Sequence, residues 1–216
     1  MAAKRLLLVE GDEDRRVIPE LIERATDLAW EDARKQRLVD IKSADGVEKL
    51  LASGYIATEV KTANLQALGV VVDADEDSAT RWQSLRDRCL SFCPDFPKTP
   101  EPDGLLVELK SKVRFGVWLM PDNSECGMLE TFLLKLRSGE TAEPLFQHVH
   151  DSVEQSQQRG AAWKNCHKDK VICHTYLAWQ DPPGRQLHQA LKEKLLDAKA
   201  EPGQRFVQWF RSLYAL

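Results

Sequence analysis

The sequence predicts an α/β fold in which helices flank a mainly parallel sheet. Two short apolar runs, residues 6–9 and 68–72, have the length and the leucine and valine content of buried strands. Each run ends at an acidic residue and is followed by a segment with the spacing of an amphipathic helix. Strands that alternate with helices along a chain are typical of this fold class.

The length favours one domain. The 216 residues are too few for two domains of ordinary size. We therefore expect one domain over residues 1–216, with a core over about 4–137 and a helical C-terminal elaboration over about 138–216.

In the first part of the chain we expect a strand over residues 5–9 and then a helix, because apolar residues recur at helical spacing from Val17 to Ala29. Asp12 is the expected N-cap of this helix, and Pro19 is tolerated only near its first turn. The next expected elements are a strand over 38–41, helices over 47–51 and 56–65, and the buried strand over 68–72.

In the second part of the chain, four prolines between residues 93 and 104 exclude a helix or a ladder there, so we expect an exposed loop. Before this loop we expect a helix around Trp82, Leu85 and Cys89, and after it a strand over 115–120 and helices over about 127–137 and after Pro144. The last expected elements are a strand over 171–178 and two helices, over about 186–198 and 204–214, that Pro202 and Gly203 separate.

Composition and charge exclude several classes of protein. Lysine and arginine number 30 and aspartate and glutamate 34, so the net charge of -4 argues against non-specific coating of DNA. No apolar run approaches the roughly 20 residues of a membrane span, and the N-terminus has no signal-peptide core. Five cysteines without a framework spacing indicate free thiols. We expect a cytoplasmic protein with no membrane partner.

Acidic residues follow both apolar strands. Glu10 ends the first strand, and Asp73, Asp75 and Asp77 follow the second. In open α/β sheets ligands bind at the carboxyl ends of the strands, so these carboxylates should converge. Like charges held together need a cation or raised pKa values, and Mg²⁺ (or Mn²⁺) is the natural partner of carboxylate oxygens.

Acids after strands can also cap helices or belong to a calcium-binding loop. Asp12, Asp75 or Asp77 could each simply cap a helix. A calcium loop of the EF-hand type is excluded, because Ser78 and Ser84 stand where that loop needs glycine and glutamate.

The run Leu-Leu-Leu-Val-Glu-Gly-Asp-Glu-Asp over residues 6–14, with an Asp-x-Asp pair after a later valine-rich strand, resembles the Toprim domain of topoisomerases, primases and overcoming-lysogenization-defect nucleases. This resemblance covers residues 4 to about 80. The phrases at 118–123, 127–130 and 174–178, with Trp209, are similar to small stand-alone bacterial Toprim-like proteins of uncharacterised function that are related to those nucleases.

The resemblance implies roles for individual residues. Glu10 would be a metal ligand or a general acid/base, and Asp73 and Asp75 the metal-binding aspartates. Asp14, with Gly11 before it, completes the first motif and would orient rather than ligate. Glu130, with Asp122 beside it, would hold a second ion.

Departures from the Toprim pattern argue against a topoisomerase or a primase. Ser78 stands where a glycine is frequent, no tyrosine has the context of a topoisomerase nucleophile, and a primase zinc module is absent from the sequence. The sequence also lacks the motifs of dehydrogenases, ATPases, zincins and serine hydrolases.

We therefore expect a metal-dependent nuclease that hydrolyses phosphodiesters, on DNA rather than RNA, and by analogy a separate ATPase partner. The alternative is a non-catalytic Toprim fold that serves as an interaction or nucleic-acid-sensing module. A homodimer stays open, because oligomeric state leaves no signature in this sequence.

Basic and sulfur-containing residues are further candidates for catalytic, metal-binding or nucleic-acid-binding roles. Lys170, in the densest late basic cluster, would be a catalytic lysine at a strand edge that stabilises charge on the leaving group, unless that cluster is only a solvated surface. A zinc site at Cys166-His167 and Cys173-His174 is disfavoured, because neighbours on a strand point to opposite faces. Arg81, on the helix after Asp77, would contact nucleic acid or pair with a local acid.

Overall fold

The computed structural model describes residues 4–33, 36–139 and 142–216. In this part of the chain a five-stranded sheet has the order β2-β1-β3-β5-β4, in which the first four strands are parallel and β4 is antiparallel to β5. The strands are β1 (Lys4–Val9), β2 (Asp40–Ser43), β3 (Leu65–Asp73), β4 (Leu105–Glu108) and β5 (Arg114–Met120). The predicted α/β class is confirmed.

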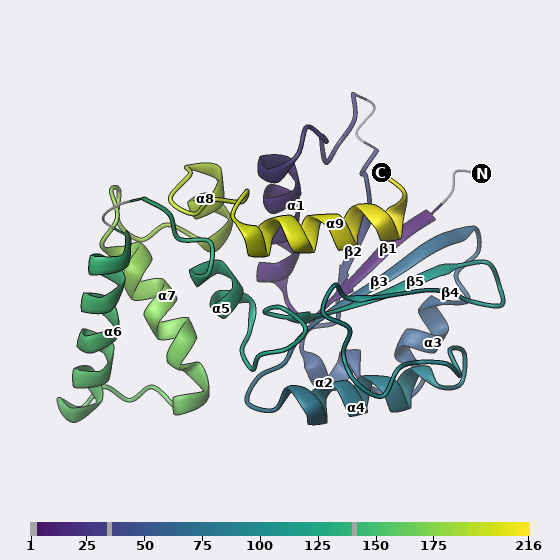
Figure 1. Cartoon of the computed structure of the whole chain (residues 1–216), viewed down its shortest axis with the longest axis horizontal. Helices are drawn as coiled ribbons and strands as arrows, with labels where there is room; N and C mark the ends of the chain where they lie inside the picture. The colour runs from purple at the N-terminus through teal and green to yellow at the C-terminus, as the bar shows by residue number, and fades with distance from the viewer. Residues whose placement is uncertain (1–3, 34–35, 140–141) are drawn as a thin grey trace.

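Helices cover both faces of the sheet (Figure 1). The helices of the first half are α1 (Asp12–Ala25), α2 (Val47–Leu50), α3 (Tyr55–Glu59) and α4 (Ser78–Cys89). Those of the second half are α5 (Leu129–Leu134), α6 (Ala142–Gln158), the short 3-10 turn η1 (Asn165–His167), α7 (Lys168–Ala178), α8 (Leu187–Lys192) and α9 (Glu201–Tyr214). One face packs against α1, α5, α8 and α9, and the other against α2, α3 and α4.

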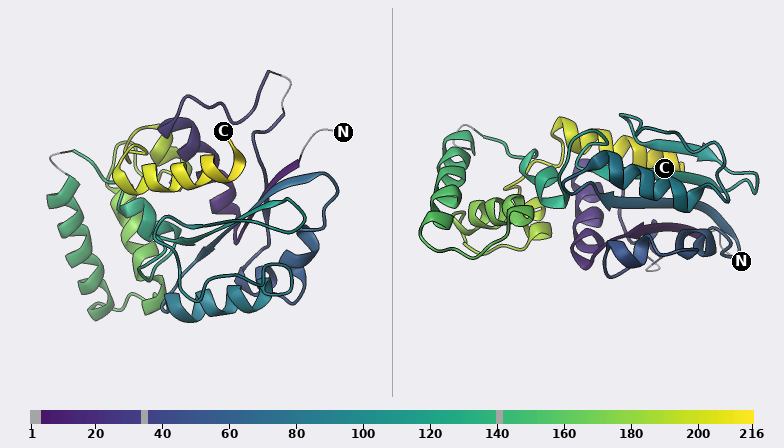
Figure 2. Two further views of the ribbon diagram at one scale, coloured as in Figure 1. Left: turned by 45° about the vertical axis from the view of Figure 1, so that its right-hand side comes forward. Right: turned by 90° about the horizontal axis from the view of Figure 1, so that it is seen from below.

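Within the C-terminal elaboration, α8 packs on α1 and α9 packs on the sheet. Helices α6 and α7 of the same region extend sideways from the carboxyl end of the sheet (Figure 2). They pack on each other, and α7 also packs on α5. None of the described helices is long and apolar enough to cross a lipid bilayer.

The strands carry apolar side chains on both faces of the sheet, so helices cover both faces. Leu7 and Val9 of β1 point into the core beneath α1 and α9, whereas Leu6 and Leu8 point into the core above α4. Gly69 of β3 has no side chain because α9 lies directly on it: a Cβ there would be 2.6 Å from the Tyr214 hydroxyl oxygen. A near-continuous apolar run is the expected signature of such a strand.

The connections place a crevice between β1 and β3. From β1 the chain passes through α1 to β2 on one side, and then returns through α2 and α3 to β3 on the other side of β1. The strand order thus reverses at the carboxyl ends of β1 and β3, which is where open α/β sheets bind ligands. Glu10 directly follows β1, and Asp73 is the last residue of β3.

One predicted strand is wrong. Residues 171–178 belong to helix α7, whose buried residues Ile172, Cys173, Tyr176 and Leu177 recur at helical spacing. A short apolar run does not by itself distinguish a strand from a buried helix. Cys173 is buried in α7 and His174 is exposed, while Cys166 and His167 lie exposed in η1.

Smaller differences concern the ends of elements. Gly11, not Asp12, is the N-cap of α1, and Pro19 lies in the middle of that helix. Pro202 and Gly203 begin α9 instead of separating two helices, which is tolerated because a first-turn proline lacks only an N–H that is unpaired anyway. Strand β4, which follows the proline-rich loop, was not expected.

Candidate functional site

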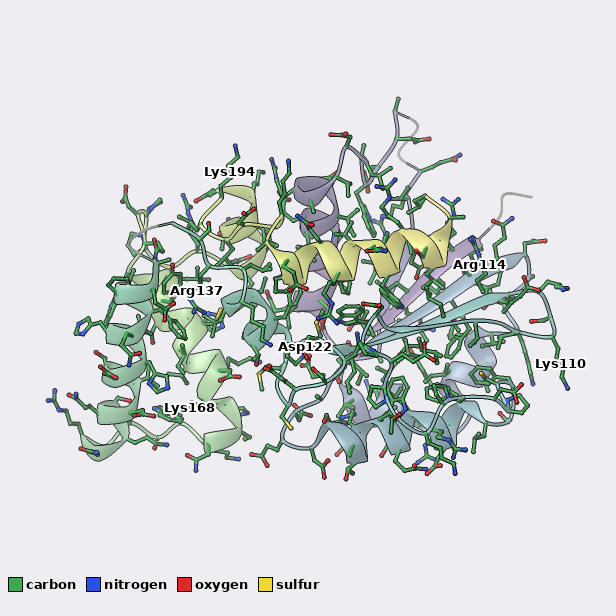
Figure 3. The ribbon with its side chains drawn as sticks, viewed as in Figure 1. Lys110, Arg114, Asp122, Arg137, Lys168 and Lys194 are labelled. Carbon is green, nitrogen blue, oxygen red and sulfur yellow. The ribbon has the colours of Figure 1, made fainter. Side chains whose placement is uncertain are left out.

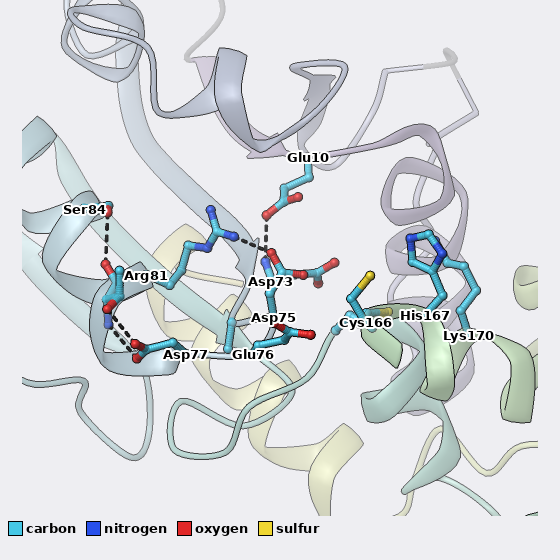
Figure 4. A pocket seen from close by; sticks show the side chains of 13 residues that line it. Glu10, Asp73, Asp75, Glu76, Asp77, Arg81, Ser84, Cys166, His167 and Lys170 are labelled. Atoms are coloured by element: carbon cyan, nitrogen blue, oxygen red, sulfur yellow. Dashed lines mark hydrogen bonds and ion pairs between the residues drawn. The ribbon is translucent and has the colours of Figure 1, made fainter. Parts of the chain in front are cut away.

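A cleft of about 640 Å³ opens at the carboxyl edge of the sheet, between the strand ends and α7 (Figure 4). Acidic residues form one wall: Glu10, Asp73, Asp75, Glu76 and Asp77. Helix α4 adds Thr80, Arg81 and Ser84, and the opposite wall carries Cys166, His167 and Lys170 from η1 and α7. The predicted acids of the two strand ends are therefore brought together.

Glu10 connects the two strand ends. Its Oε1 accepts a hydrogen bond of 2.9 Å from the backbone N–H of Asp73. Burial raises the pKa of Glu10 to about 7, and this rise is opposed by the hydrogen bond from Asp73 and by the charge of Arg81. Glu10 is therefore poised to gain or lose a proton near neutral pH.

Asp73 anchors the next helix of the site. Its Oδ1 accepts a 3.0 Å hydrogen bond from the backbone N–H of Leu129, the first residue of α5. Burial raises the pKa of Asp73 well above its ordinary value, and the charges of Asp14, Glu10 and Glu130 raise it further. This carboxylate thus lies at the centre of a crowded group of acids.

Asp75 has an unusual backbone conformation. Its φ is 53°, in the left-handed region that aspartate adopts more readily than most residues. Two backbone hydrogen bonds of 2.8 Å join it to Gly127, one in each direction. The Asp75 carboxylate, with 44% of the side chain exposed, pairs with the Arg81 guanidinium.

Two buried acids lie behind these three. The Asp14 carboxylate accepts a 3.0 Å hydrogen bond from the backbone N–H of Gly11, and burial together with the charge of Glu130 raises the pKa of Asp14 to about 6. Glu130 is buried, and its Oε1 lies 3.4 Å from the ammonium of Lys170. The interior of the cluster thus has Lys170 as its counter-charge.

Lys170 reaches the site from a helix and not from a strand edge. Its neighbour in the basic cluster, Lys168 (Figure 3), points elsewhere and pairs with Glu154 at 2.8 Å. Residues two positions apart on a helix lie about 200° apart around its axis, and the packing of α7 against α5 decides that Lys170 is the one that faces Glu130.

Asp122 and Asp77 are engaged by other groups. Asp122 pairs with Lys135 and accepts hydrogen bonds from the backbone N–H groups of Ser124 and Glu125, and it does not line the cleft. Burial opposes the change, but Lys135 and hydrogen bonds from the Glu125 backbone N–H and the Ser124 hydroxyl lower the pKa of Asp122 to about 2. Asp77 caps α4 through Thr80, which confirms the capping interpretation for this residue.

Sequence reasoning missed the partners that hold the acids. Pairing of Arg81 with a local acid is one of two alternatives in the sequence analysis, but the sequence does not single out Asp75, nor does it predict the roles of Gly127 and of the Leu129 N–H. Backbone contacts between distant segments leave no pattern in residue type.

The donor set fits a hard divalent cation. Carboxylate oxygens are the ligands that Mg²⁺ and Mn²⁺ prefer. Burial raises the pKa values of Glu10, Asp14 and Asp73, and the charges of neighbouring carboxylates raise them further, so a bound cation would stabilise the charged forms. Among the described residues, no group of three acidic, histidine or cysteine side chains is already arranged as a metal site. Glu10, Asp73 and Asp75 each contact a protein group through one carboxylate oxygen, so their other oxygens would have to move closer together to bind a cation.

Fold and site together define a three-layered α/β protein with an acidic cluster at the switch point of a parallel sheet. The chain belongs to the family described as Protein of unknown function (DUF3226), and the match covers residues 4–215. It therefore includes both the sheet and the helical C-terminal region. No curated protein and no solved structure matches the chain.

Proposed function

We propose that this protein is a divalent-metal-dependent nuclease of Toprim type that hydrolyses phosphodiester bonds in the acidic cleft. The observation that carries the proposal is the meeting of Glu10 and Asp73 at the carboxyl ends of β1 and β3, with Asp75 beside them. Clefts of this composition at a sheet switch point suit phosphoryl chemistry, because they place oxygen ligands where a substrate phosphate can enter.

Glu10, Asp73 and Asp75 would hold Mg²⁺ or Mn²⁺, with Glu130 behind them for a second ion and Asp14 as an orienting residue. A bound ion of this kind lowers the pKa of an attacking water and offsets the charge of the phosphate. The pKa of Glu10, raised to about 7 by burial, also suits a carboxylate that accepts a proton from water at neutral pH.

Lys170 supports the same chemistry from the opposite wall. About half of its side chain is exposed while its partner Glu130 is buried, so the charge is paired and still accessible. A fixed ammonium stabilises negative charge that develops on a leaving oxygen.

The proposed substrate is nucleic acid, and DNA rather than RNA. Arg81, His167 and Lys170 give the cleft basic groups for a phosphate backbone in a protein whose net charge is negative. The resemblance to overcoming-lysogenization-defect nucleases also leads us to propose a separate ATPase partner.

The test is cleavage of supercoiled plasmid, linear duplex, single-stranded DNA and RNA with Mg²⁺ or Mn²⁺. We expect hydrolysis by the wild type and its loss in Asp73→Asn and in Asp75→Asn. Asp77→Asn is the matched control, because it removes the same charge from the same cleft and asparagine still caps α4.

Equal cleavage by the wild type and Asp73→Asn would contradict the proposal. So would a wild-type protein that cuts none of these substrates while metal raises its melting temperature, which is the behaviour of a non-catalytic binding module.

A further inference from the structure

Arg81 forms an ion pair with Asp75, one of the three proposed metal ligands of the cleft. Arg81 lies in the first turn of α4, and its Nη2 donates to Asp75 Oδ2. Only 17% of the Arg81 side chain is exposed, so the guanidinium is held within the site and is not a free surface group.

Most of the hydrogen-bonding capacity of Arg81 is unused. A guanidinium has five N–H donors in a fixed plane. Within the part of the chain that the structure describes, the Asp75 carboxylate is the one acceptor to which the Arg81 guanidinium donates. Figure 4 shows the side chain reaching from α4 toward Glu10 and Asp73, and its charge lowers the pKa of Glu10. The remaining donors therefore lie next to the acids.

A divalent cation and Arg81 would compete for Asp75. Both bind through its carboxylate oxygens, and a cation at Glu10 and Asp73 would also repel the guanidinium. The other buried acids do not offer Arg81 a replacement, since Glu130 is paired with Lys170 and Asp14 with the Gly11 N–H. Once displaced, the guanidinium would lie in the cleft with the planar donor array that matches phosphate oxygens.

We propose that Arg81 is the phosphate-binding residue of the cleft, which Asp75 holds in the metal-free protein and releases toward a phosphodiester oxygen when a divalent cation takes Asp75. This inference rests on the proposed function, because its ligand is the phosphodiester of that reaction. It adds the order of events: metal first, then a phosphate on Arg81.

The first experiment releases Arg81 without metal. Binding of a short fluorescein-labelled single-stranded oligodeoxynucleotide is measured by anisotropy in EDTA for the wild type, Asp75→Asn, Asp77→Asn, Arg81→Ala and the double variant Asp75→Asn/Arg81→Ala. Asp77→Asn controls for lost charge, because the Asp77 carboxylate accepts hydrogen bonds from Thr80 and not from the Arg81 guanidinium.

We expect Asp75→Asn to bind the oligonucleotide at least about threefold more tightly than Asp77→Asn, which is the scale of one exposed ion pair. The gain should vanish when Arg81 is alanine. An equal gain in Asp77→Asn, or a gain that persists in the double variant, would overturn the inference.

The second experiment measures competition directly. Mn²⁺ binding by calorimetry, without substrate, should be at least about threefold tighter in Arg81→Ala than in the wild type, because the competitor of the metal is gone. Arg88→Ala is the control, since Arg88 is an exposed arginine on the same helix and does not line the cleft. Unchanged Mn²⁺ affinity in Arg81→Ala, or no Mn²⁺ binding by either protein, would overturn the inference.

Neither readout requires turnover. A wild type that cuts no substrate would contradict the proposed function, whereas these two sets of binding constants decide the role of Arg81.

Discussion

The side chain of Glu10 accepts a hydrogen bond from the backbone N–H of Asp73, 63 residues further along the chain. This contact joins the carboxyl ends of β1 and β3 and buries a carboxylate beside three other acids. Keeping these like charges buried together costs free energy of folding, and this cost depends on the pH and on the charged partners of the acids.

The metal-free protein should lose stability as the pH rises from about 4.5 to about 7, because the folded state raises the pKa of Glu10 over this range and so binds its proton more tightly than the unfolded chain does. The difference between 4.5 and about 7 corresponds to about 3 kcal/mol, present at low pH and lost above pH 7. Urea unfolding at a series of pH values checks it against Glu10→Gln, which keeps the acceptor for Asp73 and should lack this part of the slope. Identical slopes in the two proteins would contradict the prediction.

Glu130→Gln and Asp122→Asn should differ in their effect on metal-dependent cleavage. Glu130 couples electrostatically to Asp14 and Asp73, whereas Asp122 lies outside the cleft with Lys135. We expect at least about a tenfold fall in kcat/KM for Glu130→Gln and less than about a twofold change for Asp122→Asn. Plasmid cleavage at varied Mn²⁺ concentration measures both, and the reverse ranking would restore Asp122 as a metal ligand.

Asp122 should instead contribute to acid stability. Its pKa is lowered from 3.8 to about 2 in the folded protein, so its stabilising effect is complete above about pH 4 and is lost as the pH falls toward 2. Asp122→Asn should cost about 1–2 kcal/mol at pH 7, and the difference from the wild type should disappear near pH 2. Denaturant titrations at both pH values decide this, and a difference that persists at pH 2 would show that the loss has another cause.

Lys170→Met should be more harmful than Lys168→Met, although the two lysines are two residues apart. Removing Lys170 leaves Glu130 buried without its counter-charge, which we expect to cost about 1–3 kcal/mol and to reduce kcat at least about tenfold. Lys168 forms a surface pair with Glu154, worth less than about 1 kcal/mol. Chemical denaturation and cleavage rates compare them, and equal effects would mean that Lys170 is only a surface residue.

Gly69→Ala and Tyr214→Phe should interact. A Cβ at Gly69 would lie 2.6 Å from the Tyr214 hydroxyl oxygen and 2.7 Å from Leu7, so Gly69→Ala should cost about 2–3 kcal/mol. Tyr214→Phe should cost about 1 kcal/mol, because its hydroxyl donates to the Leu6 carbonyl at 2.8 Å. Removing the hydroxyl relieves part of the clash, so the double variant should lose less than the sum of the two. Urea unfolding of all four proteins tests this, and strict additivity would contradict it.

Residues 171–178 and strand β4 are two segments whose secondary structure could not be predicted from sequence patterns. Residues 171–178 have the composition of a strand, and their helical state depends on packing Ile172, Cys173 and Leu177 against neighbours. Strand β4 exists because its backbone pairs with β5 after the proline loop, not because of its own pattern. Both errors concern short segments whose state is decided by distant partners.

The sequence by itself determined the α/β class and the place of the acidic cluster. Buried apolar runs and helical periodicity are local properties, and the residues that follow parallel strands must gather at one edge of the sheet, so Glu10, Asp73 and Asp75 could be placed together in advance. Only the tertiary structure decided that Arg81 holds Asp75, that Lys170 faces Glu130, and that Lys135 holds Asp122 away from the cleft. The physical reason is that the partner of a charge depends on which surfaces pack together, and long-range packing sets the distances on which electrostatic energies depend.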